Sequence, residues 1–249
     1  MSRFAMFSMM VAATALVPAC AQEDAGRALE REEIEEIVHD YIVENPEVIE
    51  EALIKLSKKA DQRDQAAKRD AIKSNLDSIY NSSNDYSIGP DDAEVTVVEF
   101  FDYRCGFCKR SMEWTTGLPE KYDGNVRVIF KEFPILSPES EKAALAALAA
   151  GNQGKYTEMH RELMEMDNST GFEPDDIDGA AERAGVDVAQ MREDMDSVEL
   201  RKVVADNKSL ARSIGVDGTP AYFIGENMVS GANQGKVVEF IEAELSDNG

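Results

Sequence analysis

The chain has few cysteines, few histidines and few positive charges for its length. Its 249 residues include three cysteines, two histidines and one tryptophan, and 26 lysines and arginines stand against 49 aspartates and glutamates. The formal net charge of −23 argues against binding to nucleic acid or to anionic membrane surfaces, because both carry negative charge themselves. The charge favours solubility and identifies no partner. A hydrophobic content of 43% is enough for the core of one large domain, with or without an appendage.

The first 21 residues have the pattern of an export signal. Arg3 supplies a short positive start, and residues 4–17 are mostly apolar but too few to span a membrane comfortably. Cleavage after Ala21 would remove Cys20. Residues 17–20 also resemble a bacterial lipobox, in which case Cys20 would be the lipidated first residue of the mature protein, and we favour this second form. We therefore expect a protein of the periplasm or cell envelope, anchored there through Cys20 if the lipobox is used.

The other two cysteines are close together and follow a predicted strand. Residues 95–101 are rich in β-branched and aromatic side chains, and Cys105-Gly106-Phe107-Cys108 comes where a helix would begin. Free N–H groups and the positive end of a helix dipole favour a thiolate, so the pKa of Cys105 should fall from about 8.5 toward about 3.5–7.5. Such a thiolate attacks and leaves well, as thiol–disulfide exchange requires. The spacing predicts a redox-active pair in which Cys105 and Cys108 form a disulfide.

Two other roles for this pair fit the sequence less well. A tetrahedral zinc site needs four ligands, and Cys20, His39 and His160 do not lie at partner spacing. A purely structural disulfide would close a very short loop and constrain the unfolded chain little. We therefore expect no metal and no organic cofactor, and we expect His160 to be a packed, hydrogen-bonded core residue.

A helical section precedes the cysteine region. Apolar residues recur at helical spacing over residues 34–42 and again over residues 49–56, after the capping pair Asn45-Pro46. Two short helices with one apolar stripe each bury little by themselves, so they must dock on the rest of the chain or on a second copy. A charged helical connector is expected over residues 57–69.

Turn-forming residues at 81–92 mark the predicted boundary of this section. We interpret residues 22–80 as a helical section that forms a homo-oligomer through residues 28–56. Residues 81–249 then form the catalytic domain.

The catalytic domain alternates strands and helices. After the cysteine helix, which should end near Gly117, we expect a strand, a block of helices, a two-stranded hairpin and a last helix. The expected ranges are 126–133 for the strand, 138–213 for the helical block, 221–224 and 228–230 for the hairpin with Glu226-Asn227 at its turn, and 236–245 for the last helix. A Cys-x-x-Cys motif beside such an α/β pattern is typical of a thioredoxin-like fold.

Three segments resemble a known family. The sequences EFFDYRCGFCKR, VRVIFKEFPIL and GVDGTPAYFIG, which lie in this order within residues 86–246, are similar to those of the DsbA-type thioredoxin-fold oxidoreductases of bacterial envelopes. The resemblance implies an α/β thioredoxin fold with a helical domain inserted over residues 138–213. It also implies a cis peptide bond before Pro220, placed against the cysteine pair. The acidic helical section resembles that of the ScsC-type proteins.

The resemblance also assigns roles to single residues. It places Glu99 beneath the pair, where the acid exchanges a proton with Cys108. An ionisable group in an apolar strand is costly unless it is neutral or paired, so the pKa of Glu99 should rise, and we expect Lys131 to be its charge partner. Cys105 is the expected nucleophile. Phe107, Thr219 and Pro220 are the residues expected to hold the client.

The sequence therefore predicts an exported protein-disulfide oxidoreductase that acts on cysteine-containing exported proteins and exchanges electrons with a membrane redox partner. Similarity of Gly106-Phe107 and Thr219-Pro220 to DsbC-type isomerases, together with the self-associating section, favours an isomerase over a dithiol oxidase of DsbA type. Two further alternatives are a protein that binds Cu(I) through the cysteine pair and a structural envelope lipoprotein with an inert disulfide.

Overall fold

A computed structural model describes residues 30–169 and 171–248. The predicted export signal and Cys20 lie outside these residues. The described residues divide into two units, with the division between Lys59 and Ala60. Within the described ranges, none of the helices is both long enough and apolar enough to cross a membrane.

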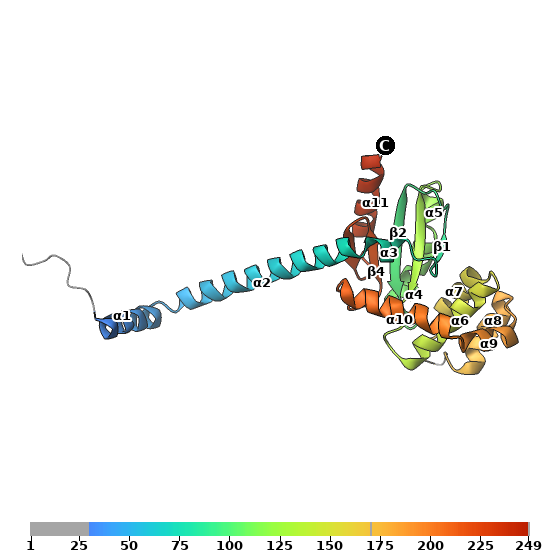
Figure 1. Ribbon diagram of the computed structural model, residues 1–249, viewed down its shortest axis with the longest axis horizontal. Helices are drawn as coiled ribbons and strands as arrows, with labels where there is room; N and C mark the ends of the chain where they lie inside the picture. Colours follow the sequence, from blue (N-terminus) through green and yellow to red (C-terminus); the bar gives the residue numbers. More distant parts are fainter. Residues whose placement is uncertain (1–29, 170, 249) are drawn as a thin grey trace, which may run out of the picture. The chain divides into compact units, whose positions relative to one another are not determined.

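The described part of the first unit is helical (Figure 1). It contains α1 (Arg31–Glu44) and the start of α2 (Glu47–Ser74). The predicted second helix and the predicted connector are one continuous helix, because residues 57–69 contain no glycine or proline and consist mostly of good helix formers. No residue of α1 is buried. Large apolar side chains of this unit are 45–64% exposed, namely Ile34, Ile37, Val38, Tyr41, Val43, Ile49, Leu53, Ile54 and Leu56.

The second unit is built on a five-stranded sheet in the order β1-β3-β2-β4-β5. The two central strands, β2 (Val95–Phe101) and β3 (Val126–Glu132), are parallel, and β4 (Ala221–Ile224) runs antiparallel to β2. All three occupy the predicted ranges closely, since their apolar side chains are buried on both faces of the sheet. The sheet thus brings the end of β2, which precedes the cysteines, next to the start of β4.

Two parts of the sheet differ from the prediction. Strand β1 (Tyr86–Ile88) lies in the segment expected to be a loop and pairs antiparallel with β3. The turn between β4 and β5 (Asn227–Ser230) consists of Gly225-Glu226, one residue earlier than predicted, because Ile224 pairs with Asn227. Gly225 has a φ of 55° there, a conformation that glycine adopts without steric strain.

Helices cover both faces of the sheet. On one face, α4 (Gly106–Thr116), α5 (Leu118–Lys121) and α11 (Gln234–Asn248) contribute to the larger apolar cluster. On the other face, α3 (Leu76–Tyr80) and the end of α2 pack through Ile72 and Ile79 in a second cluster. Through these two isoleucines, the end of α2 and α3 belong to the second unit, although both precede the turn-rich segment that we took as the boundary.

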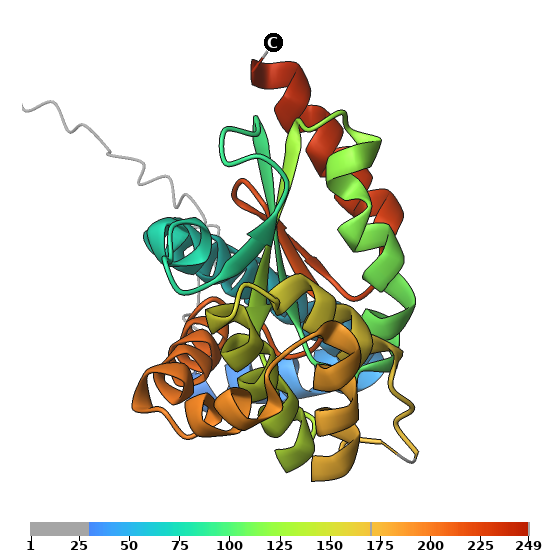
Figure 2. The same ribbon diagram turned by 90° about the vertical axis from the view of Figure 1, so that its right-hand side faces the viewer.

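Residues 138–213 form five helices between β3 and β4. They gather at one end of the sheet, from yellow-green to orange in Figure 2. The helices are α6 (Pro138–Asn152), α7 (Tyr156–Glu165), α8 (Pro174–Ala184), α9 (Val188–Met195) and α10 (Val198–Ser213). Helix α6 begins at the predicted cap, where Ser137 accepts a hydrogen bond from the N–H of Ser140. Its alanines are fully buried, and their small size lets α7 and α9 approach closely.

Candidate active site

The two cysteines lie at the first turn of α4, as predicted. Cys105 is the N-cap residue, and its backbone N–H donates to the carbonyl of Asp102 at 3.0 Å. Cys108 is fully buried one turn further on, whereas Phe107 between them is 57% exposed. Both cysteines are free thiols. Both residues are buried, but Cys105 is 7% exposed and Cys108 is not exposed at all, so Cys105 is the more accessible of the two.

The environment separates the acidities of the two thiols. A hydrogen bond from the Cys108 thiol outweighs the effect of burial and, with hydrogen bonds from the Thr219 side chain and from two backbone N–H groups, lowers the pKa of Cys105 to about 5. Burial raises the pKa of Cys108, and its hydrogen bond to Cys105 raises it further. Near neutral pH, Cys105 is therefore a thiolate and Cys108 a thiol. These unequal acidities are what the predicted roles require, with Cys105 as the nucleophile and Cys108 as the resolving cysteine.

The segment before β4 lies directly against Cys105. The peptide bond between Thr219 and Pro220 is cis, as the family resemblance implied. The Cys105 sulfur is 3.2 Å from the carbonyl oxygen of Thr219, to which Cys105 donates when it is protonated. Pro220 is buried, and Thr219 precedes the first residue of β4 that pairs in the sheet. Three of the predicted residues are thus brought together from positions 114 residues apart.

Glu99 is buried beneath this site on β2. Burial raises its pKa to about 8, against the lowering effect of a hydrogen bond from Tyr222. The Tyr222 hydroxyl donates to Glu99 Oε1 at 3.0 Å. Glu99 and Tyr222 are directly opposite each other in the antiparallel β2–β4 pair. The charge of Cys105 adds to the increase, so the acid and the thiol pair are electrostatically linked.

Lys131 is not the partner of Glu99, contrary to our expectation. Successive side chains of a strand point to opposite faces of the sheet, and Glu99 pairs in register with Phe130, so the neighbouring Lys131 points to the other face. There it forms an ion pair with Asp85, and both side chains are at most 2% exposed. Within the described part of the chain, Glu99 therefore has a hydroxyl partner and no cation.

Asp102 is a site residue that the sequence analysis missed. Its carboxylate accepts hydrogen bonds from the N–H groups of Ile135 and Leu136, at 2.8 and 3.0 Å, and from the Ser140 hydroxyl at 2.8 Å. It also accepts from the N–H of Arg104 at 2.7 Å. One buried carboxylate thus fixes the loop after β3 beside the cysteine turn. A polar residue at the end of a buried strand was the available signal.

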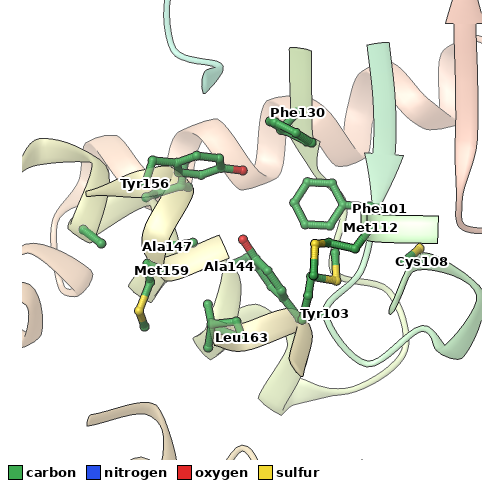
Figure 3. Close-up of a cluster of buried hydrophobic side chains, with 14 of the residues drawn as sticks. Phe101, Tyr103, Cys108, Met112, Phe130, Ala144, Ala147, Tyr156, Met159 and Leu163 are labelled. Carbon is green, nitrogen blue, oxygen red and sulfur yellow. The ribbon is translucent and has the colours of Figure 1, made fainter. Parts of the chain in front are cut away.

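A third buried acid, Glu132, is hydrogen-bonded to two tyrosines of the hydrophobic cluster that Figure 3 shows. Glu132 accepts hydrogen bonds from the hydroxyls of Tyr103 at 3.0 Å and Tyr156 at 2.9 Å, and these two hydroxyls are directed toward each other. His160 Nδ1 lies 3.1 Å from the Tyr103 hydroxyl, and burial lowers the pKa of His160 to about 3. His160 is therefore a neutral, hydrogen-bonded core residue, which confirms the prediction.

None of the described residues forms a group of three or more histidine, cysteine, aspartate or glutamate side chains suited to a metal ion. The site therefore consists of two thiols, a buried acid and the cis-proline turn. These groups are sufficient for thiol–disulfide exchange, in which thiolates attack and leave and protons are moved.

Comparison with known proteins agrees with this geometry. Residues 81–243 match a family model described as thioredoxin. The chain belongs to the thioredoxin family. Residues 30–66 match a second model, the N-terminal domain of the copper resistance protein ScsC.

Relatives of this thioredoxin-family chain differ in how much of their length it covers. The structure of the thiol–disulfide exchange protein alpha-DsbA2 from Wolbachia pipientis has a TM-score of 0.66 and 27% identity, and the match covers 74% of this chain and 98% of that one. The structure of Proteus mirabilis ScsC in a compact conformation has a TM-score of 0.64 and 29% identity. That match covers 88% of this chain and 99% of the ScsC chain. A curated relative, the Na⁺/H⁺ antiporter NhaA 1 of Salinispora arenicola, is 32% identical over 142 residues. This chain spans only 21% of its length.

These findings confirm the predicted resemblance to DsbA-type and ScsC-type proteins and the predicted fold class. The family, the two thiols of unequal acidity and the similarity to a thiol–disulfide exchange protein make disulfide exchange the activity to propose for this chain.

Proposed function

We propose that this protein catalyses disulfide exchange in exported, cysteine-containing proteins, and that it rearranges wrong disulfides more than it makes new ones. The observation that carries the proposal is the asymmetric pair: Cys105 is ionised and lies against Thr219, and Cys108 is protonated and covered. The site of action is the periplasm or cell envelope, and a membrane redox partner restores the redox state of the cysteine pair.

The chemistry follows from this asymmetry. The Cys105 thiolate attacks one sulfur of a client disulfide, so that a mixed disulfide forms and the other client sulfur leaves as a thiolate. In an isomerase, a second client thiolate then attacks the client sulfur of the mixed disulfide and releases Cys105. If no client thiol arrives, Cys108 gives its proton to Glu99, attacks Cys105 and releases the client in reduced form.

The surface around Cys105 suits an unfolded client. Phe107, Ile135 and Leu136 are 57%, 40% and 53% exposed, and they are among the few large apolar side chains of the second unit that face solvent. Asp102 holds the Ile135–Leu136 backbone beside the cysteine turn. Thr219 precedes the start of β4 and lies outside the sheet ladder, and we propose that its backbone pairs with an extended client segment next to the thiolate.

The amino-terminal unit supports the preference for isomerisation. Its large apolar side chains are 45–64% exposed, with Ile37 at 56% and Leu53 at 60%, and closed association between copies would bury them. Several Cys105 sites would then surround one client and raise the local concentration of thiolate. We propose that residues 28–56 form this homo-oligomer.

The test compares the full-length protein with its double variant Ile37→Ser, Leu53→Ser. We expect the wild type to sediment as an oligomer and to refold a client with scrambled disulfides, and the variant to sediment as a monomer that keeps dithiol reductase activity but loses refolding. A monomeric wild type, or a monomeric variant that refolds as well, would reject the isomerase proposal in favour of a dithiol oxidase. Cu(I) titration of the reduced protein tests the remaining alternative, because tight binding without exchange activity would make the pair a copper site.

A further inference from the structure

Three buried hydroxyls connect the carboxyl of Glu99 to helix α4. Tyr222 on β4 is fully buried, and its hydroxyl lies 3.0 Å from Glu99 Oε1, 3.1 Å from Ser111 Oγ and 3.1 Å from Thr115 Oγ1. Ser111 and Thr115 lie on α4, the helix that carries both cysteines, and they are at most 1% exposed. Tyr222 therefore connects the acid on β2 to the helix that carries both cysteines.

The hydrogen bonds of this group can be satisfied for both protonation states of Glu99. A phenol hydroxyl donates one hydrogen and accepts through its lone pairs. When Glu99 is ionised, Thr115 donates to Tyr222 and Tyr222 donates to Glu99. When Glu99 is protonated, the carboxylic acid donates to Tyr222, and Tyr222 turns its hydrogen to Ser111 Oγ.

Ser111 is available as an acceptor in the second state. Its own hydrogen is directed to the backbone carbonyls of Phe107 and Cys108, at 3.0 and 3.1 Å, so the lone pairs of its Oγ remain free for Tyr222. The change between states needs only hydroxyl rotation, with no movement of heavier atoms. A buried acid that must gain and lose a proton repeatedly is well served by such an arrangement, because neither state leaves a buried polar group without a partner.

We propose that Tyr222 is a positioning residue for Glu99, whose hydroxyl turns between Glu99 and Ser111 as the acid gives up and receives the proton of Cys108. This inference rests on the proposed disulfide exchange. In the resolving step, the Cys108 thiol gives its proton to the Glu99 carboxylate, and the Cys108 sulfur bonds to Cys105. The bond between Cys105 and the client sulfur breaks, and the client leaves as a thiolate with both electrons of that bond.

Tyr222 is the only hydrogen-bond partner recorded for the Glu99 side chain in the described part of the chain, and no cation offsets the charge. The two thiols of Cys105 and Cys108 face Glu99 from the start of α4, and Tyr103 does so from the turn after β2. On β3, Glu132 lies on the same face of the sheet. Helix α11 contributes the apolar Val237 and Ile241 to this face.

All of these neighbours disfavour the charged form of Glu99 or leave it unchanged, so the Tyr222 hydroxyl is the group that stabilises the carboxylate. Removing this hydroxyl should therefore raise the pKa of Glu99 further. Near neutral pH a smaller fraction of Glu99 would be ionised, and the resolving step would slow in proportion.

The experiment follows the Glu99 carboxyl directly. Carbon-13 NMR titration of the reduced full-length protein, with the signal assigned by its loss in Glu99→Gln, gives the titration midpoint in the wild type and in Tyr222→Phe. We expect the midpoint to rise by about one pH unit, because the loss of a hydrogen bond to a charged carboxylate shifts its pKa by at least about that amount. Thr115→Val removes the donor behind Tyr222 and should give a smaller shift in the same direction.

Tyr156→Phe is the matched control. It also removes a buried phenol hydroxyl from a buried carboxyl, that of Glu132, and so it should lower stability to a similar degree. It should leave the midpoint of Glu99 unchanged. The inference would be overturned if Tyr156→Phe and Tyr222→Phe shifted the Glu99 midpoint equally. It would also be overturned if neither Tyr222→Phe nor Thr115→Val shifted that midpoint.

The rate of resolution gives the second measurement. A preformed mixed disulfide between Cys105 and a small peptide thiol should resolve about tenfold more slowly at neutral pH in Tyr222→Phe, and as fast as in the wild type well above the new midpoint. A slower rate at every pH would overturn the inference, because a merely structural role predicts that result. If the wild type itself formed no mixed disulfide, the proposed function would fail, while the NMR midpoints would still decide the link between Tyr222 and Glu99.

Discussion

The buried acid makes a prediction about stability as well as catalysis. In the unfolded chain Glu99 titrates at its usual pKa of 4.5, whereas burial raises the pKa to about 8 in the folded protein. The folded state therefore binds a proton that the unfolded state has lost between these two values. Stability that is fully present below pH 4.5 is lost progressively as the pH rises toward 8. Glu99→Gln removes this titration and keeps the shape of the side chain.

The size of the effect follows from the two pKa values. Each unit of difference corresponds to about 1.4 kcal/mol, so the full penalty above pH 8 is on the order of 5 kcal/mol, and about 3 kcal/mol of it is present at pH 7. Glu99→Gln should therefore gain stability over the wild type as the pH rises from 4 to 8, with little difference at pH 4. Because both proteins keep the cysteine pair, the titration of Cys105 itself largely cancels in the comparison.

Urea unfolding of the reduced proteins across this pH range measures the difference. Glu120→Gln is a suitable control, since Glu120 is exposed. We expect the control to follow the wild type at every pH. A constant difference between Glu99→Gln and the wild type from pH 4 to 8 would refute the reasoning, because it would mean that Glu99 titrates alike in both states. The same variant should resolve mixed disulfides slowly while it binds clients normally.

Three other outcomes are expected. In the reduced protein at pH 6, iodoacetamide should label Cys105 and spare Cys108, as mass spectrometry of the peptides would show; faster labelling of Cys108 would reverse their roles. Lys131→Met should lower the free energy of unfolding by about 3–5 kcal/mol, measured by thermal or urea unfolding, because it leaves Asp85 buried without its cation. Adding Asp85→Leu should recover most of this loss. If the two substitutions instead lowered stability additively, the prediction would be wrong. Phe107→Ser should change stability by less than about 0.5 kcal/mol but raise the KM for an unfolded client, and an unchanged KM would remove Phe107 from the client surface.

Much of the catalytic unit could be predicted because its signals are local. The buried strand before Cys105 and the capping serine of α6 depend on residues close together in the sequence, and both were placed correctly. The cis bond before Pro220 could be expected only from the family resemblance. Strand β1 was missed because its three residues are too few for a period of two to be recognised, and its pairing with β3 is a long-range property.

The partners of Glu99 could not be predicted from charge alone. Lys131 is the nearest cation in the predicted strands, but a sheet sorts side chains by alternation, and the register of β2 with β3 puts the lysine on the opposite face. Tyr222 would have been found by the same rule, if the antiparallel pairing of β2 with β4 had been known. The register of a sheet is therefore the information that a single sequence lacks here.

The buried charged groups on the two faces of the sheet also differ in whether they have a partner of opposite charge. On the face away from the cysteines, Lys131 and Asp85 form an ion pair. Each side chain stabilises the charge of the other, so the role of this pair is structural. On the face beneath the cysteines, Glu99 has no cation, and its pKa is left near 8, within reach of neutral pH. A cation beside Glu99 would lower that pKa and fix the carboxylate in its charged form, which could no longer return a proton to Cys108. In the proposed exchange the acid can work in both directions, because its only hydrogen-bond partner among residues 30–169 and 171–248 is a hydroxyl, which stabilises the charge without abolishing the titration.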